Sequence, residues 1–227
     1  MRVRITFSKS GALKYIGHLD LNTVWERATR RAGLPLAYSQ GFHPQPKMAF
    51  ASALPLGFSS RCEVMDMHLN QDVDLASISA QLQNALPPGI GIIRVESMDE
   101  HEPALQTQVL SVEYEAILTE TVDESSLKQK IDEVMACQSL PRQRRGKSYD
   151  LRPLIEELSL TPLHLPPTSL NMGEVSLQGE GGLRVFMRLA AREGATGRPE
   201  EVLDALGIAI ENARVERTRL IFKNQAW

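Results

Sequence analysis

Two histidines near the start of the chain, His18 and His43, are the side chains best suited to acid–base chemistry. A ribonuclease that works without metal needs one group to deprotonate the 2′-hydroxyl and another to protonate the 5′-oxygen, and imidazole titrates near the required pH. His18 also directly precedes a predicted helix, whose first backbone N–H groups favour a phosphate. Catalysis by these residues stays an alternative, because a histidine beside a helix start is more often structural. A metal site built from His18, Asp20 and His43 is less favoured, because no fourth ligand is suggested.

The stretch "YSQGFHPQPKMAFASALPLG" (38–57) holds three prolines and two glycines, too many helix breakers for a helix. The prolines predict a stiff, extended loop that carries Tyr38, Phe42, His43 and Lys47. Aromatic rings beside cations are how proteins hold single-stranded RNA. The structural alternative is that Phe42 and Phe50 fill the core while the prolines only fix a wide connection.

Clustered cations are the strongest candidates for phosphate contacts. Arg27, Arg30 and Arg31 lie on one side of the predicted helix, away from its apolar stripe. "RQRRGK" (142–147) predicts a basic hairpin tip, although a solvated turn explains it equally well. The complete set of predicted nucleic-acid contacts is Lys9, Lys14, His18, Arg27, Arg30, Arg31, Phe42, His43, Lys47, Arg142, Arg144, Arg145 and Lys147.

The charge is distributed unevenly along the chain. Residues 1–61 carry nine basic and two acidic side chains, a charge of +7, so a net charge of −3 leaves −10 for the remainder. Seven of the twelve aromatic residues also lie in this segment. The asymmetry indicates a local electropositive face for an anionic partner, or a basic face that is solvated or paired with acids of the same chain.

Several function classes lack their motifs. The sequence has no CxxxCxxC, Walker A, GxGxxG or GxSxG pattern, so no iron–sulfur, nucleotide or hydrolase site is predicted and no cofactor is expected. Cys62 and Cys137 stand apart without metal-ligand spacing, which favours a reducing cytoplasm. No apolar run reaches the length of a signal peptide or membrane span, so no membrane association is expected.

The first predicted helix positions most of these candidates. Leu21, Trp25 and Ala28 have the spacing of one buried helical stripe. Asp20 is its predicted N-cap, with Leu19 packing on Val24 as a hydrophobic staple. Gly33 is predicted to end the helix in a left-handed conformation.

The remaining elements predict an α+β protein. Around that helix, the first half is predicted to have strands at 2–7, 47–54, 63–69 and 90–98, and a helix at 75–86 capped by Asp74. After a polar linker at 99–108, strands and helices alternate again, with Asp123 as cap of a helix at 124–136. Each half therefore predicts the β-α-β-β-α-β pattern, giving two tandem ferredoxin-like domains at 1–100 and 109–227. In the last strand, Arg217 and Arg219 are predicted to share one face, and protection of a sheet edge is a sufficient alternative to a phosphate contact for them.

The chain resembles a known family in several stretches. These are "FSKSG", "HLDL", "RATRRAGLPLAYSQGFHPQPKMAFASALPLG", "SYDLRPLI", "TGRPEEVL" and "VERT". Together they resemble the radical-SAM-linked family, a domain of unknown function encoded beside, or fused to, radical S-adenosylmethionine proteins. The resemblance implies a radical SAM protein as partner and implies no activity.

The function expected from the sequence is a cytoplasmic, non-enzymatic RNA-binding adaptor that presents a structured RNA, such as tRNA or rRNA, to a radical SAM partner. One alternative is a metal-independent endoribonuclease that uses His18 or His43. The other is a protein-interaction module that does not touch RNA.

Overall fold

The computed structural model describes residues 1–144, 146–162 and 182–223. The chain forms two compact units. Unit 1 comprises Met1–Val112, Ala191–Gly194 and Glu216–Trp227, and unit 2 comprises Glu113–Ala190 and Ala195–Val215. Both units are α+β, and strand pairing is mostly antiparallel within a large sheet. The boundaries of these units differ from those of the domains expected at 1–100 and 109–227, because the last strand contributes residues to both units.

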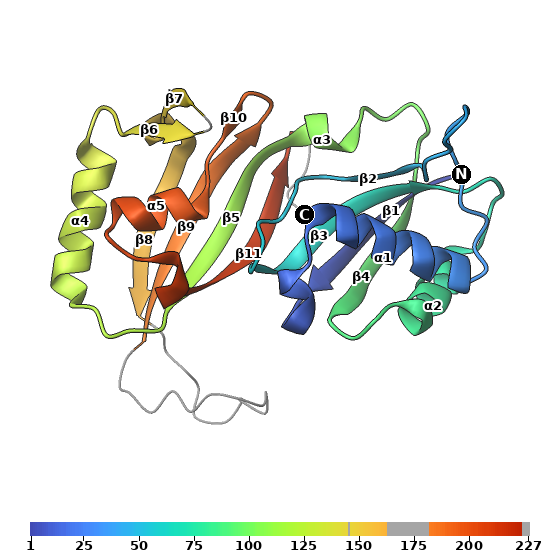
Figure 1. Ribbon diagram of the computed structural model, residues 1–227, viewed down its shortest axis with the longest axis horizontal. Coiled ribbons are helices and arrows are strands. Elements are labelled where there is room, and N and C mark those ends of the chain that lie inside the picture. Colours follow the sequence, from blue (N-terminus) through green and yellow to red (C-terminus); the bar gives the residue numbers. More distant parts are fainter. Residues whose placement is uncertain (145, 163–181, 224–227) are drawn as a thin grey trace. The chain divides into compact units, whose positions relative to one another are not determined.

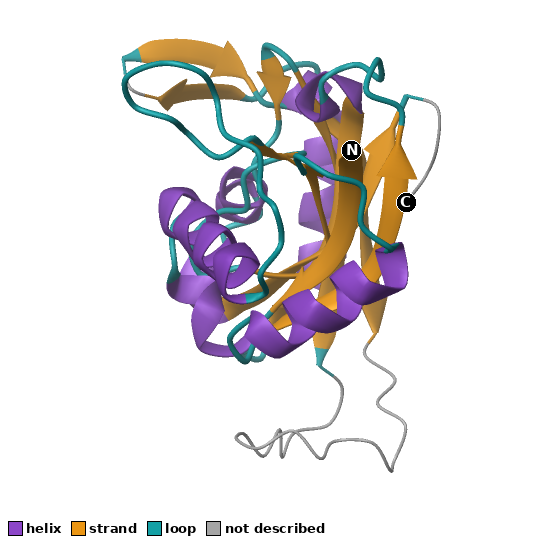
Figure 2. Cartoon of the chain, turned by 90° about the vertical axis from the view of Figure 1, so that its right-hand side faces the viewer, coloured by secondary structure: helices purple, strands orange, loops and turns teal. Residues whose placement is uncertain are grey.

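Unit 1 begins with β1 (Arg2–Lys9), the 3-10 helix η1 (Gly11–Tyr15) and α1 (His18–Arg31). It continues with β2 (Met48–Phe50), β3 (Ser59–His68), α2 (Leu75–Ala85), β4 (Ile90–Met98) and α3 (Leu105–Gln108). The connection between α1 and β2 is almost entirely loop, as the teal segments of Figure 2 show. The predicted strand 47–54 is therefore shortened to three residues.

The strands of unit 1 are ordered β4-β1-β3-β2, and all three neighbouring pairs are antiparallel. At the centre, Ile5 of β1 pairs with Met65 of β3 and with Val95 of β4. Helices α1 and α2 pack on one face of these strands (Figure 1) and supply Trp25 and Leu82 to a single core. Phe7 and Trp25 make an edge-to-face contact there, with ring centroids 4.8 Å apart.

Helix ends were partly predictable. Asp74 caps α2 by accepting a hydrogen bond from the Ser77 N–H, and Gly33 follows α1 with φ +70°, both as predicted. The prediction for the start of α1 was wrong. Gly17 is its N-cap and Asp20 lies in the first turn, while Leu19 is 80% exposed and forms no staple.

The other face of the unit 1 sheet carries a buried ion cluster. Arg2 and Arg4 both bind Asp66, at 2.7 and 2.8 Å, and all three side chains are buried. The guanidinium of Arg2 also donates to the carbonyls of Glu102 (2.6 Å) and Pro103 (3.0 Å). Arg2 therefore fixes the segment predicted as a linker, and this part of the sheet face is covered.

The described residues of unit 2 form two α-helices and a separate hairpin. The elements that lie wholly or partly in unit 2 are β5 (Val109–Leu118), α4 (Glu124–Ala136), β6 (Pro141–Arg144), β7 (Lys147–Asp150), η2 (Arg152–Leu154), β8 (Ile155–Pro162), β9 (Leu183–Arg192), β10 (Ala195–Thr196), α5 (Pro199–Ala205), η3 (Ile210–Asn212) and β11 (Ala213–Phe222). The strand order is β10-β9-β5-β11, with β8 paired to β9, while β6 and β7 pair only with each other. Asp123 caps α4 by accepting from the Ser126 N–H, as predicted.

The last strand corrects one interpretation of the sequence. β11 has a strand on each side, so it is not an edge. Arg217 is 1% exposed and Arg219 is exposed, so the two side chains do not share an environment. Protection of a sheet edge was therefore the wrong explanation for Arg217.

Among the described residues, no helix is long and apolar enough to cross a membrane.

Candidate functional site

Helix α1 presents an exposed stripe whose character changes along its length. Leu19, Thr23, Arg27 and Arg30 follow one another at the spacing of one helix face, opposite the buried Trp25. The stripe is apolar where the helix starts and basic where it ends. The fourteen residues of the helix separate these two ends by about 20 Å at 1.5 Å per residue.

At the basic end, residues 38–47 form a hairpin-like loop with a fixed base. Tyr38 bridges to Pro46, the Ser39 N–H donates to the Gln45 carbonyl at 2.8 Å, and the Lys47 N–H donates to the Ala37 carbonyl at 2.8 Å. Phe42 at the tip is 102% exposed, and His43 beside it is also exposed. The core-filling interpretation is therefore wrong for Phe42, since an exposed ring at the tip of a fixed loop contributes nothing to packing, but it is confirmed for Phe50, which is buried in the core.

A surface network joins this loop to α1. The Tyr38 hydroxyl accepts a hydrogen bond from Arg30 Nε at 3.0 Å and donates to Glu26 at 3.2 Å, and Arg30 forms an ion pair with Glu26 at 2.9 Å. The hydrogen bond with Tyr38, and then the charge of Glu26, raise the pKa of Arg30. The loop is thus oriented by the end of α1.

The three predicted arginines of α1 differ in their surroundings. Arg30 is engaged with Tyr38, and Arg31 donates to the Ala85 carbonyl at the end of α2 at 2.7 Å. Arg27 is exposed and has no hydrogen bond or ion pair within the described part of the chain. We define the basic surface as Arg27, Arg30, Arg31, Phe42, His43 and Lys47, all of which are exposed.

A shallow groove adjoins the basic surface between the ends of α1 and α2. It has a volume of about 650 Å³ and is lined by Arg31, Gln81 and Asn84, together with Ala32 and Ala85–Pro87. Side-chain amides can donate to and accept from the edges of unpaired bases, and a guanidinium can donate to them.

At its other end, α1 is surrounded by exposed apolar side chains. Tyr15 is 65% exposed, Leu19 80% and Leu56 63%. The Gly57 N–H donates to the Lys14 carbonyl at 2.8 Å, which brings the loop of Leu56 against η1. The Lys14 ammonium lies 4.9 Å from the centroid of the Tyr15 ring. We define the apolar surface as Tyr15, Leu19 and Leu56.

Three charged side chains are buried next to this end of α1. Lys9, Glu63 and Arg217 are each at most 2% exposed. Arg217 binds both carboxylate oxygens of Glu63, at 2.9 and 3.1 Å, and donates to the carbonyls of Ser52 (3.2 Å) and Ala53 (2.8 Å). Lys9 donates to the Ile16 carbonyl at 3.2 Å. The cluster thus holds the two loops that carry Tyr15 and Leu56.

Burial shifts the titration of this cluster. Burial lowers the pKa of Lys9. The negative charge of Glu63 acts in the opposite direction, and the positive charge of Arg217 lowers the pKa further. Burial and the charge of Glu63 raise the pKa of the neighbouring Cys62 thiol to about 12. Cys62 therefore stays a protonated thiol that cannot act as a nucleophile at neutral pH.

The two histidines lie at different ends of α1. His18 is exposed at the helix start, with its ring 5.3 Å from that of Phe50. His43 is on the loop that Tyr38 ties to the helix end. The remaining predicted cations of unit 1 divide similarly, with Lys47 on that loop, Lys14 near the apolar surface and Lys9 buried beneath it.

The predicted basic hairpin of unit 2 faces acidic residues. Arg142 pairs with Asp204 of α5 at 3.4 Å. Burial raises the pKa of Glu201 on the same helix, while the charges of Arg144 and Arg142 act in the opposite direction. Lys147 is exposed, and Arg145 lies outside the described residues.

The base of this hairpin is held by Asp150. Its carboxylate accepts from the backbone N–H groups of Leu140 (2.8 Å) and Arg152 (3.0 Å). These hydrogen bonds, that of Leu140 first, lower the pKa of Asp150. The basic segment therefore has an acidic partner in the same chain, since Arg142 pairs with Asp204.

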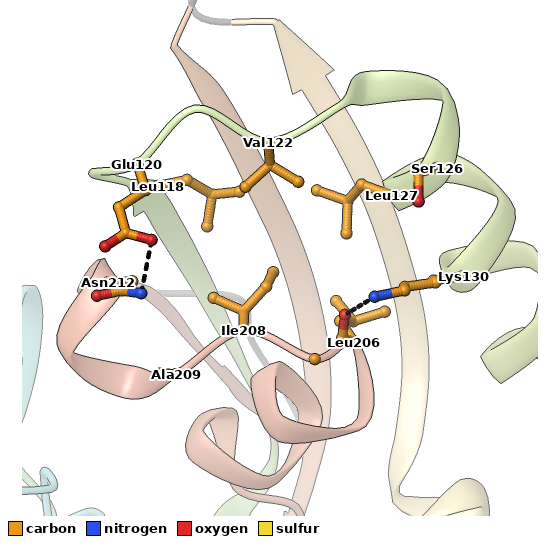
Figure 3. A pocket seen from close by; sticks show the side chains of 11 residues that line it. Leu118, Glu120, Val122, Ser126, Leu127, Lys130, Leu206, Ile208, Ala209 and Asn212 are labelled. Atoms are coloured by element: carbon orange, nitrogen blue, oxygen red, sulfur yellow. Dashed lines mark hydrogen bonds between the residues drawn. The ribbon is translucent and has the colours of Figure 1, made fainter.

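A small cavity of about 90 Å³ lies in unit 2, between the end of β5, α4 and the turn after α5 (Figure 3). Leu118, Leu127 and Ile208 give it an apolar interior. Asn212 donates to Glu120 at 2.8 Å, and Lys130 donates to the Leu206 carbonyl at 3.2 Å, so these polar groups already have partners. None of the predicted site residues lines it, and we assign it no chemistry.

Sequence reasoning missed the Glu63–Arg217 pair, which joins residues 154 positions apart. The available signal was a charged residue within each of two otherwise apolar strand faces. Within the part of the chain that the structure describes, no group of three or more His, Cys, Asp or Glu residues could hold a metal ion.

Comparisons with known proteins place the chain among bacterial sequences. A family model described as "Uncharacterized protein conserved in bacteria (DUF2344)" matches residues 2–199. No curated protein matches. A solved structure that does match is a chain of the "Crystal Structure of a Cbf5-Nop10-Gar1 Complex", with 11% sequence identity and a TM-score of 0.47. The match covers 96% of this chain and 48% of that one, so this chain spans about half its length.

Proposed function

We propose that this chain, which belongs to the bacterial family DUF2344, is an RNA-binding adaptor whose basic surface holds unpaired nucleotides. The observation that carries the proposal is the wholly exposed Phe42, on a loop whose base is fixed by hydrogen bonds and oriented by Arg30. An exposed ring that is already held in place offers a stacking face without the cost of ordering a mobile loop.

The surroundings of Phe42 support RNA as its ligand. His43 can stack beside it, Lys47 and Arg27 can contact phosphates, and the adjoining groove offers amide groups for base edges. Because Arg30 and Arg31 already have partners, we assign them mainly to orienting the loop and lining the groove. Arg27 and Lys47 are the proposed phosphate contacts.

The finer parts of the proposal have separate support. A radical SAM protein as the recipient of the RNA, and a cytoplasmic location, follow from the family resemblance and the cysteine usage. We also infer that each unit is ferredoxin-like, because the strand orders β4-β1-β3-β2 and β11-β5-β9-β8 are equivalent. Cleavage of RNA by His18 and His43 together has less support, since they belong to opposite ends of α1.

Fluorescence anisotropy with a labelled single-stranded RNA of about 16 nucleotides tests the proposal. We expect Arg27→Glu and Lys47→Glu each to weaken binding and to reduce the slope of log affinity against log salt by about 0.7. Lys128→Glu, an exposed helical cation of unit 2, is the matched control and should change nothing. Equal RNA affinity in all four proteins would overturn the proposal.

A further inference from the structure

We infer that the apolar surface, formed by Tyr15, Leu19 and Leu56, docks a partner protein through an apolar segment that carries a carboxylate opposite Lys14. This surface is separate from the one proposed for RNA, and the inference does not depend on RNA binding. Single exposed apolar residues are common on proteins, but three large ones on adjoining segments mark an interaction site.

The three side chains come from segments held close to one another. Tyr15 and Leu19 flank the start of α1, only four residues apart. The hydrogen bond from Gly57 to Lys14 joins the loop of Leu56 to them. At the other side of η1, the Ser10 N–H donates to the Gly89 carbonyl at 2.8 Å. A side chain on Gly89 would lie 2.7 Å from the Ser10 carbonyl oxygen, so this close approach requires glycine.

Buried charges hold the backbone beneath this surface. Lys9 binds the Ile16 carbonyl just before α1, and Arg217 binds two carbonyls of the loop that leads to Leu56. Burying three charges is costly even when they are paired. The arrangement gives the apolar surface a fixed shape, and a fixed shape reduces the entropy lost when a partner binds.

The chemistry of the surface favours protein over RNA. Two of its three members are leucines, which offer aliphatic area but neither an aromatic face for a base nor a donor for a phosphate. Aliphatic area is best matched by the apolar side chains of another protein.

The charges at its border favour an acidic partner. The Lys14 ammonium lies beside the Tyr15 ring. Lys14 has no ion pair within the described residues. The Asp20 carboxylate lies 3.5 Å from the position of a Cβ on Gly17, so it faces the N-terminus of its own helix. Lys14 is therefore left to pair with a carboxylate of the partner.

Selection from a displayed library of peptides of about 15 residues, long enough for a helix, tests the inference on the purified full chain. We expect selected peptides to combine Leu, Ile or Phe with Asp or Glu. Leu19→Glu and Leu56→Ser should each weaken their binding at least about tenfold, the ratio that marks a hot-spot contact. Ile93→Ser, which removes an exposed apolar side chain from β4, is the matched control and should leave binding within about twofold.

Other outcomes overturn the inference. Failure to select peptides, selection of basic peptides, or equal binding to the Leu19→Glu protein would each reject this docking surface. If light scattering shows a dimer that Leu19→Glu dissociates, the occupant is a second copy of the chain. If Leu19→Glu weakens RNA binding as much as Arg27→Glu does, the occupant is RNA. A loss of RNA binding in Arg27→Glu alone would leave the inference standing, because the two surfaces are tested by different variants.

Discussion

The two ends of α1 differ in which side chains are buried and which are exposed. At the helix start, Lys9, Glu63 and Arg217 are buried while Leu19 and Leu56 are exposed. At the helix end, the exposed Arg30 forms its network with the half-buried Glu26 and Tyr38. Charged residues therefore serve two different purposes at the two ends of the helix. Buried ions fix the backbone beneath a binding surface, whereas exposed ions are themselves available to a ligand.

The largest expected difference between the two ends is in stability. Glu63→Gln leaves Lys9 and Arg217 buried together without a counter-charge, and we expect it to lower the free energy of unfolding by about 3–5 kcal/mol. Glu26→Gln at the other end removes a half-buried partner of the exposed Arg30 and should cost less than about 1 kcal/mol. Denaturation in urea measures both, and equal losses would contradict the distinction between the ends.

Phe42→Ala should act on RNA binding and not on stability. We expect a loss of about 1–3 kcal/mol in RNA affinity, the size of a stacking contact, because the ring is wholly exposed and available to a base. The melting temperature should stay unchanged. Leu19→Ala provides the comparison at the other end of α1, and an equal loss of RNA affinity there would show that one continuous surface binds RNA.

A pH titration isolates Lys9. Its pKa is lowered by burial, so between that value and the ordinary 10.5 the unfolded chain binds more protons than the folded one. The contribution of Lys9 to the free energy of unfolding therefore rises with pH through that window. Below the window, Lys9 is charged in the folded protein and the full cost of burying that charge is present. We expect wild type to gain stability relative to Lys9→Met as the pH approaches 10.5. If the free energies of unfolding of the two proteins differ by the same amount at every pH, burial does not lower the pKa of Lys9.

The smallest effect is expected in thiol reactivity. Because burial raises the pKa of Cys62 to about 12, iodoacetamide at pH 8 should not modify it in the folded protein. The half-buried Cys137 should react first, and both should react in urea. Mass spectrometry of labelled peptides reports each site. Rapid labelling of Cys62 in the folded state would mean that the helix start opens readily.

Local signals predicted those elements whose ends are decided locally. The caps Asp74 and Asp123, the terminating Gly33 and the strand 90–98 all follow from residues within a few positions of one another. The start of α1 did not follow, although Asp20 is a suitable cap. The preceding backbone is held by Lys9 through the Ile16 carbonyl, and the helix begins at His18.

Long-range pairing accounts for the other errors. The predicted strand 47–54 ends at Phe50, and the carbonyls of Ser52 and Ala53 bond to Arg217 rather than to a neighbouring strand. Spacing within one strand could not show that Arg217 would reach Glu63. For the binding surfaces, the sequence indicated the stiff loop with Phe42, His43 and Lys47. It gave no sign that Leu19 would be exposed, since a leucine beside a helix cap ordinarily packs against the helix.

The hydrogen bond between Arg217 and the Ser52 carbonyl spans 165 residues of sequence. At 5–20 residues per second, a ribosome needs on the order of ten seconds or more to make the intervening chain. During that time the loop that carries Leu56 lacks its anchor, although β1, α1 and β3 have already left the ribosome. The finished shape of the apolar surface thus depends on residue 217 having been made, so a partner that recognises this shape selects chains that contain residue 217 over shorter nascent ones.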